Sequence, residues 1–192
     1  CTIIGERKTK GWGEPGEKYW SEQQLFFALK VSRAFDLNIA SDGRFIQEKQ
    51  AFGKNIKAVL DFETSPNEMV LVKVGISAVS AENALQNLLE EIPHWDFNKT
   101  LSETQSVWEK ELSKIKVGVS DKNKTIFYTA LYHSLLAPYL YKDVNNEYLG
   151  FDKRTHIAEK FNNYTVLSLW DTFRAENPLL TLIAPDKVND LI

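Results

Sequence analysis

The stretch MVLVKVGISAVSAENALQNLLEEIP, residues 69–93, changes its hydrophobic period at Ser80. Before Ser80, along residues 69–79, every second side chain is apolar, which is the pattern of a strand with one buried face. After Ser80, apolar residues recur at the spacing of an amphipathic helix: Ala84, Leu85, Leu88 and Leu89. Ser80 is a favourable N-cap, and Pro93 marks the end. The stretch therefore predicts a strand that leads directly into a helix.

The residues before this stretch repeat the strand pattern. Residues 24–32 (QLFFALKVS) and 56–62 (IKAVLDF) alternate in the same way, and turn-forming residues occupy 64–67. Because short turns rather than helices join these segments, we expect an antiparallel β-sandwich up to about residue 80. With helices following it, the fold class is α+β.

Further helices are expected after residue 93. One begins at Thr100, where Glu103 completes a capping box, and another spans 121–137 and ends before Pro138. The apolar stripe of the first contains Leu101, Thr104, Trp108, Leu112 and Ile115. The stripe of the second contains Ile126, Phe127, Ala130, Leu131 and Leu135. The last 25 residues are also expected to be helical, with Pro178 in a first turn or at a kink.

Charge and composition exclude several classes of partner. The 192 residues carry 26 acidic and 23 basic side chains and a net charge of -3, without a basic stripe, so nucleic acid is not an expected partner. No apolar run approaches the roughly 20 residues of a membrane span. Cys1 is the only cysteine, which excludes an intrachain disulfide. A Cys at the start suits either a lipid-modified N-terminus or a piece of a longer chain, and we favour the second.

The segment SLWDTFR, residues 168–174, holds the strongest candidate binding residues. On a helix, Asp171 and Arg174 are neighbours on one face. A surface ion pair worth roughly 0–1 kcal/mol is the ordinary explanation, but it fits badly with the apolar neighbours. The residues alone support a functional cleft and an ion pair equally. Trp170 offers a flat face for a sugar ring, although a core tryptophan is equally ordinary.

Two other groups of side chains are weaker candidates. His133 is expected to be a satisfied core or interhelical histidine rather than a general base, and His94 and His156 receive no role. A tight reversal is expected at residues 145–146. The oxygen-rich loop around it does not have EF-hand spacing, so we expect it to be solvated rather than to bind calcium. Its acidic residues are Asp143, Glu147 and Asp152.

Several blocks, in this order, resemble glycoside hydrolase family 92, the calcium-dependent exo-acting α-mannosidases. They are VLVKVGISAVSAENALQNLLEEIPHWDF, WEKELSKI, FYTALYHSLLAPYLY and YTVLSLWDTFRAENPLLTLIAP. The earlier GWGEPGEKYW and QLFFALKVSRAF are similar to later strands of the family's N-terminal sandwich. FYTALYH and SLWDTFR are the most specific parts.

The resemblance implies a multidomain architecture. Residues 1–80 would end an N-terminal β-sandwich, 81–115 would be linker helices, and 116–192 would open an (α/α)6 barrel. The chain would then be an internal fragment whose barrel is truncated, and we expect it to be inactive alone.

The resemblance also implies a reaction. Enzymes of this family hydrolyse terminal α-linked mannose, here with α-1,2 linkages expected, with inversion and with calcium bound to the sugar. The acid, the base and most calcium ligands come from later parts of the barrel, so no catalytic residue is assigned in this chain. Trp170, Asp171 and Arg174 would bind the mannose, since a carboxylate accepts from hydroxyls and a guanidinium donates to them.

The implied partners are a mannose-terminated glycan and the remainder of the same polypeptide, in the periplasm or outside the cell. Two alternatives stay open. One is a non-catalytic carbohydrate-binding or structural protein that keeps the sandwich and the SLWDTFR site. The other is a different (α/α)6 glycosidase or phosphorylase, which accommodates FYTALYH and SLWDTFR less well.

Overall fold

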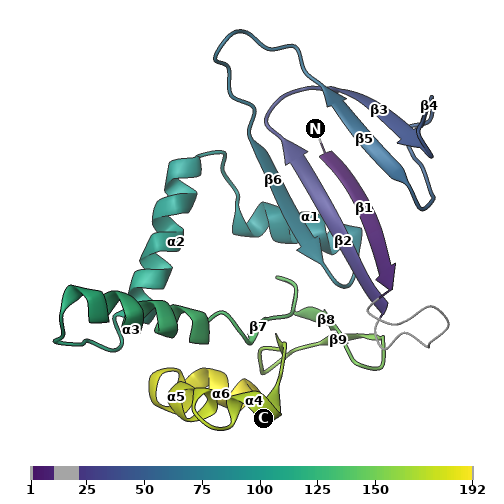
Figure 1. Cartoon of the computed structure of the whole chain (residues 1–192). Helices are drawn as coiled ribbons and strands as arrows, with labels where there is room; N and C mark the ends of the chain where they lie inside the picture. Colours follow the sequence, from purple (N-terminus) through teal and green to yellow (C-terminus); the bar gives the residue numbers. More distant parts are fainter. Residues whose placement is uncertain (1, 11–21, 192) are drawn as a thin grey trace.

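Two antiparallel three-stranded sheets form the N-terminal part of the chain in the computed structural model, which describes residues 2–10 and 22–191 (Figure 1). The first sheet has the order β1-β2-β6, from Thr2–Lys10, Glu22–Val31 and Val72–Ser77. The second has the order β4-β3-β5, from Arg44–Ile46, Asp36–Ser41 and Ile56–Asp61. The three predicted strands are confirmed as β2, β5 and β6; β2 pairs with β6 and β5 pairs with β3, both antiparallel as expected. Cys1 and the block at 11–20 lie outside the described residues.

The hydrophobic pattern alone misses the β3-β4 hairpin. Its turn is Asp42-Gly43, and both residues have positive φ, 48° and 80°. Such a turn suits an Asp-Gly pair because glycine and aspartate tolerate left-handed backbone. The Asp-Gly dipeptide was the available signal for these two strands.

Helix α1, Ala81–Glu91, covers one face of the first sheet. Ser80 caps it as predicted, and its hydroxyl accepts from the Asn83 N–H at 3.0 Å. The contact centres on three fully buried side chains: Ala28, Ala84 and Leu88. Gly75 of β6 lets the helix approach, since a Cβ there would lie 2.7 Å from Leu88 Cβ. The change of period at Ser80 is therefore a change from strand to helix on the same small core.

The other face of this sheet is apolar and open to solvent. Val72, Val74 and Ile76 alternate with the residues that face α1, and their exposed fractions are 54%, 52% and 57%. Apolar side chains on both faces are typical of a sheet that is covered on both sides.

Helices α2, Phe97–Leu112, and α3, Asp121–Ser134, follow as predicted in type but not in detail. Helix α2 begins before Thr100 because the Asp96 carboxylate accepts from the Lys99 N–H at 3.0 Å and caps an earlier turn. None of its residues is buried. The expected inward stripe of α3 is only partly correct, since Leu131 is buried but Ile126 is 60% exposed.

The C-terminal part combines short strand pairs with short helices. Strand β7, Tyr139–Leu140, pairs with β10, Tyr164–Thr165, and β8, Glu147–Leu149, pairs with β9, Thr155–Ile157. The helices are α4 (Leu169–Thr172), α5 (Glu176–Ile183) and α6 (Pro185–Leu191). Figure 1 shows the β8-β9 hairpin between the first sheet and these helices.

Two local predictions hold in this region. Pro178 lies in the first turn of α5. The reversal at 145–146 occurs with Asn146 at φ 68°, and its N–H donates to the Asp143 carbonyl at 2.9 Å. Within 2–10 and 22–191, every helix is too short or too polar to cross a bilayer.

Candidate functional site

The SLWDTFR segment forms a short helix that Ser168 anchors. The Ser168 hydroxyl donates to Asp171 Oδ2 at 2.6 Å, and its carbonyl accepts from the Asp171 and Thr172 amides at 3.0 and 3.1 Å. These bonds close one turn of α4 around Ser168. The bond from the Ser168 hydroxyl also holds the Asp171 carboxylate close to the start of α4.

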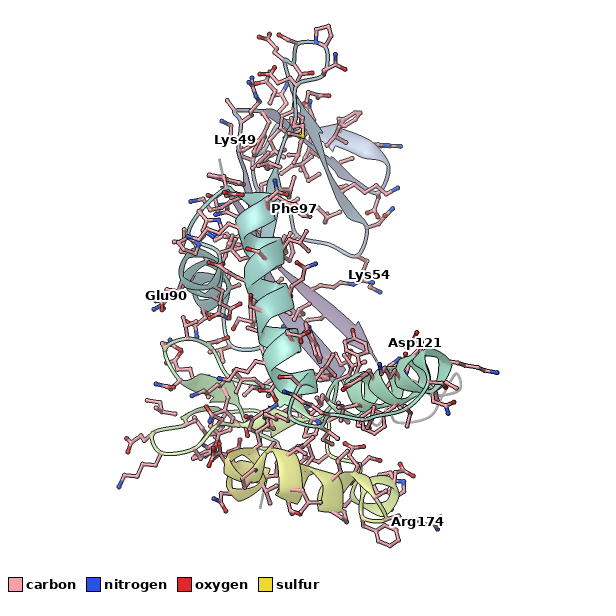
Figure 2. The ribbon with its side chains drawn as sticks, turned by 90° about the vertical axis from the view of Figure 1, so that its left-hand side faces the viewer. Lys49, Lys54, Glu90, Phe97, Asp121 and Arg174 are labelled. Atoms are coloured by element: carbon pink, nitrogen blue, oxygen red, sulfur yellow. The ribbon has the colours of Figure 1, made fainter. Side chains whose placement is uncertain are left out.

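An ion pair between Asp171 and Arg174, the ordinary alternative to a functional cleft, does not form among the described residues. The Arg174 guanidinium lies over the Phe173 ring instead, 5.6 Å from its centroid. Figure 2 shows Arg174 at the outer edge of the molecule. Trp170 is 76% exposed, so it is not a core tryptophan. All three candidate side chains are exposed, and their hydrogen-bonding and stacking groups are accessible to a ligand.

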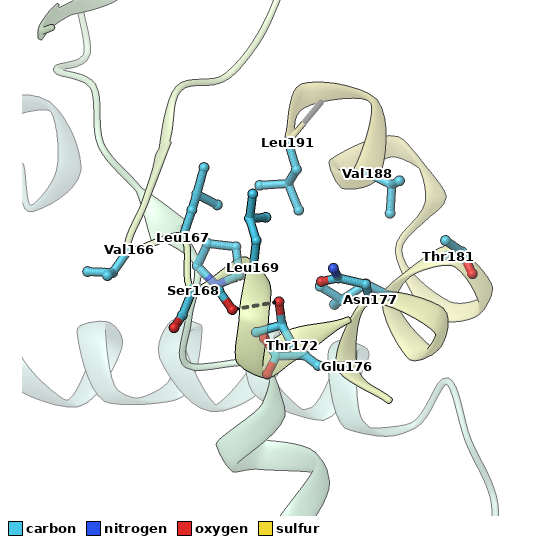
Figure 3. Close-up of a pocket in the computed structure, with 12 residues that line it drawn as sticks. Val166, Leu167, Ser168, Leu169, Thr172, Glu176, Asn177, Thr181, Val188 and Leu191 are labelled. Carbon is cyan, nitrogen blue, oxygen red and sulfur yellow. Dashed lines mark hydrogen bonds between the residues drawn. The ribbon is translucent and has the colours of Figure 1, made fainter. Parts of the chain in front are cut away.

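A cavity of about 220 Å³ lies beside α4 (Figure 3). Its apolar wall includes Leu167, Leu169, Leu180, Val188 and Leu191. Its polar residues are Ser168, Thr172, Glu176, Asn177 and Thr181. Burial raises the pKa of the Glu176 carboxyl. Trp170, Asp171 and Arg174 do not line this cavity, so the candidate sugar-binding groups lie outside it.

Asp143 is buried, so the expectation of a solvated loop is wrong for this residue, whereas Asp152 is exposed as expected. Its side chain accepts three hydrogen bonds, from Ser77 Oγ and Asn83 Nδ2 to Oδ2 at 2.7 and 2.8 Å, and from Asn87 Nδ2 to Oδ1 at 2.7 Å. Only 6% of Asp143 is exposed. A buried carboxylate is tolerated when donors surround it in this way. Glu147 joins the same cluster by accepting from Asn83 Nδ2 at 2.7 Å.

The two asparagines of this cluster were not predicted as important. Asn83 and Asn87 are both buried and stand four residues apart on α1. Two amides at i and i+4 beside the apolar stripe of a helix were the available signal, because buried amides require partners.

The histidines behave differently from one another. His133 is exposed, so the prediction of a core histidine is wrong. His156, to which no role was assigned, contacts both oxygens of Asp152 through Nε2, at 2.9 and 3.1 Å. That hydrogen bond lowers the pKa of Asp152. His94 lies 3.7 Å from Glu103, and its buried Nδ1 has no hydrogen-bond partner in the described part of the chain.

Comparison with known proteins connects these features to a family. Residues 83–192 match the glycosyl hydrolase family 92 catalytic domain. A family 92 α-mannosidase from Bacteroides thetaiotaomicron is 34% identical, with a TM-score of 0.88 over 99% of this chain and 26% of that one. The same enzyme has been solved with mannoimidazole, with 25% of its chain covered.

More distant relatives extend the comparison. An inverting family 92 mannosidase from Bacteroides thetaiotaomicron VPI-5482 has the same fold at 22% identity, with a TM-score of 0.75 over 94% of this chain and 24% of that one. An uncharacterised secreted glycosidase of Arthroderma benhamiae is 30% identical over 125 residues, which are 62% of this chain and 14% of that protein. This chain thus spans about a quarter or less of its relatives. With more than half of its length inside the family's catalytic domain, the chain belongs to glycosyl hydrolase family 92.

Proposed function

We propose that this chain is part of an exo-acting α-mannosidase that hydrolyses terminal mannose from glycans with inversion, preferring α-1,2 linkages. The observation that carries the proposal is the 34% identity to a solved α-mannosidase along 99% of this chain. The mannoimidazole complex of that relative supports a mannose-like ligand. The inverting relative supports the stereochemical outcome through its shared fold.

In this proposal the chain comprises three regions of the enzyme. Residues 1–80 end a β-sandwich, 81–115 are linker helices, and 116–192 open an (α/α)6 barrel. The exposed apolar face of β6 supports a second sheet packed on the first, since such a face is stabilised by cover. The exposed side chains of α2 and α3 support further helices packed against them.

Trp170, Asp171 and Arg174 bind the terminal mannose in this proposal. Asp171 Oδ2 accepts from Ser168, which leaves Oδ1 for sugar hydroxyls. Arg174 offers its fork of donors to the same ring, and Trp170 offers a stacking face. The acid and base that protonate the leaving oxygen and activate water are contributed by other parts of the polypeptide, and the two carboxyls of an inverting enzyme stand roughly 6.5–9.5 Å apart.

Calcium is part of the proposed enzyme, but the described residues do not fit a calcium site by themselves. No group of three or more His, Cys, Asp or Glu side chains gathers within 2–10 and 22–191. The oxygens of buried Asp143 already accept three hydrogen bonds. Most calcium ligands would therefore come from the rest of the polypeptide. We also propose a periplasmic or extracellular location, which the secreted fungal relative supports.

The substitution Asp171→Asn in the full-length polypeptide tests the assignment. It should lower kcat/KM for an α-1,2-linked mannose disaccharide at least tenfold, because an amide replaces one acceptor and its charge. The control is Asp121→Asn, which alters a fully exposed carboxylate on α3 and should leave kcat/KM unchanged.

Two outcomes would count against the proposal. A loss below about threefold, under 1 kcal/mol of transition-state binding, would remove Asp171 from the sugar site. Mannose binding without any hydrolysis by the full-length protein would instead favour the carbohydrate-binding alternative.

A further inference from the structure

The Asp143 cluster joins parts of the chain that are far apart in sequence. Its donors come from β6 and α1, in the N-terminal half, through Ser77, Asn83 and Asn87. Its acceptor lies between β7 and β8, 56 to 66 residues later. The cluster therefore fixes the start of the C-terminal region against the first sheet and its covering helix.

The contact is reciprocal, which makes its geometry specific. Asn87 donates to Asp143 Oδ1 and to the Ile76 carbonyl, while its own Oδ1 accepts from the Val144 N–H at 2.9 Å. Asn83 donates from one amide nitrogen to both Asp143 and Glu147. A loop displaced by one residue would lose these bonds together and leave buried polar groups unpaired, at a cost for each group.

The chain next to Asp143 is hydrogen-bonded to the residues that precede SLWDTFR. Two residues before Asp143, the Tyr141 N–H donates to the Asn163 carbonyl at 2.7 Å, and Asn163 Nδ2 donates back to the Tyr141 carbonyl at 2.9 Å. Strand β10 follows at once and pairs with β7. Three residues after β10 comes Ser168, the anchor of α4. Burial and the nearby Asp143 charge both raise the pKa of Tyr141, in agreement with this close packing.

We propose that Asp143 is a positioning residue for the mannose site. Through Ser77, Asn83 and Asn87 it holds the β7-β10 pair, and thereby the segment with Trp170, Asp171 and Arg174, in one place relative to the first sheet and α1. The sugar-related part of this inference rests on the proposed function, whereas the placement of the segment does not. The Asp143 hydrogen bonds would hold the sugar-binding groups in the correct orientation to within about an ångström.

The test is Asp143→Asn in the full-length polypeptide, compared with Glu159→Gln. Both replace a carboxylate by an amide, but Glu159 is exposed in the same region. The amide introduced at position 143 would place an NH₂ group, itself a donor, against the donors of Ser77, Asn83 or Asn87, so at least one of these hydrogen bonds would be lost. Amide hydrogen exchange of the Tyr141 N–H and of residues 163–172 should become at least tenfold faster. In the folded variant, kcat should fall at least tenfold with KM within about threefold.

A double variant distinguishes positioning from general damage. With Asn87→Asp added, the amide at position 143 can donate to the new carboxylate, which still accepts from the Val144 N–H. The double variant should recover at least a third of the lost protection and of kcat, although the bond to the Ile76 carbonyl is lost. Should Asp143→Asn fail to fold, Ser77→Ala removes one of the three donors to Asp143, together with the acceptor of the Val79 and Ser80 N–H groups. It should accelerate exchange at residues 163–172 by about two- to fivefold.

The results are decisive in each direction. Exchange at residues 163–172 equal to that of Glu159→Gln, in a folded Asp143→Asn or in Ser77→Ala, would overturn the inference. Faster exchange with unchanged kcat would overturn the positioning role. If the wild-type polypeptide releases no mannose, the proposed function fails instead, and the exchange comparison still decides whether Asp143 places the SLWDTFR segment.

Discussion

Gly75 is where a single atom decides how closely α1 packs on the first sheet. A Cβ at this position would meet the Ala84 carbonyl and lie 2.7 Å from Leu88 Cβ. Both neighbours belong to the buried contact of the helix, so neither can move without loss of packing. Gly75→Ala in the full-length polypeptide should therefore lower the free energy of unfolding by about 1–3 kcal/mol, the usual cost of overpacking.

Urea denaturation followed by far-UV circular dichroism measures that effect. Gly118→Ala is the matched control, because a Cβ at residue 118 would meet no atom within 4 Å. The control should be neutral or slightly stabilising, since alanine restricts the unfolded chain. Equal midpoints for the two variants would show that α1 does not pack as closely as described.

For the candidate site residues, the sequence did not predict which neighbours each side chain contacts. Helical spacing makes Asp171 and Arg174 neighbours and so allows an ion pair, but it does not say which of several nearby groups each side chain contacts. Asp171 accepts a hydrogen bond from Ser168, and Arg174 lies over the Phe173 ring; both partners are within three residues in the sequence. Asp143 shows the opposite case, since its partners are 56 or more residues away and nothing local to the loop reveals them.

Helix caps operate at the scale of the element, and two serines provide a direct comparison. Ser80 accepts from the Asn83 N–H at the start of α1, whereas Ser120 makes no side-chain capping bond at the start of α3. Ser80→Ala should lower the free energy of unfolding by about 1 kcal/mol, the usual value of a serine cap. Ser120→Ala should change it by no more than about 0.5 kcal/mol.

Both variants are compared by thermal unfolding and by hydrogen exchange of the Asn83 amide. Faster exchange should appear only in Ser80→Ala. If the two serines proved equivalent, the cap would contribute nothing beyond the packing of α1 on its sheet.

The elements predicted most accurately are those whose local signals agree. Helix α1 has a single N-cap, Ser80, one apolar stripe and one helix-ending residue, Pro93, and the helix begins and ends where these residues predict. Helix α2 has two competing caps, Asp96 and Thr100, of similar chemistry. Asp96 caps the helix, and the Thr100 hydroxyl donates to the Asp96 carbonyl at 3.2 Å. Which of the two residues caps the helix depends on the local backbone conformation, which cannot be read from the sequence.

At the scale of the whole molecule, apolar surface is distributed unlike that of a self-contained domain. The open face of the first sheet carries Val72, Val74 and Ile76, each more than half exposed, and Leu182 of α5 is 81% exposed. Contiguous apolar patches of this kind mark contacts with other protein surfaces. The chain covers 26% of its solved relative, so most of that enzyme's structure has no counterpart within these residues.

We therefore predict that the isolated 192-residue chain releases no mannose and self-associates. Exposed sheet and helix faces favour association, and the proposed acid and base belong to other parts of the polypeptide. Size-exclusion chromatography with light scattering measures the first property, and an α-1,2-linked mannose disaccharide assay measures the second. The full-length polypeptide is the control and should be active. Mannose release by the isolated chain, abolished by a calcium chelator, would place the catalytic groups within these residues and require a new assignment of the carboxylates.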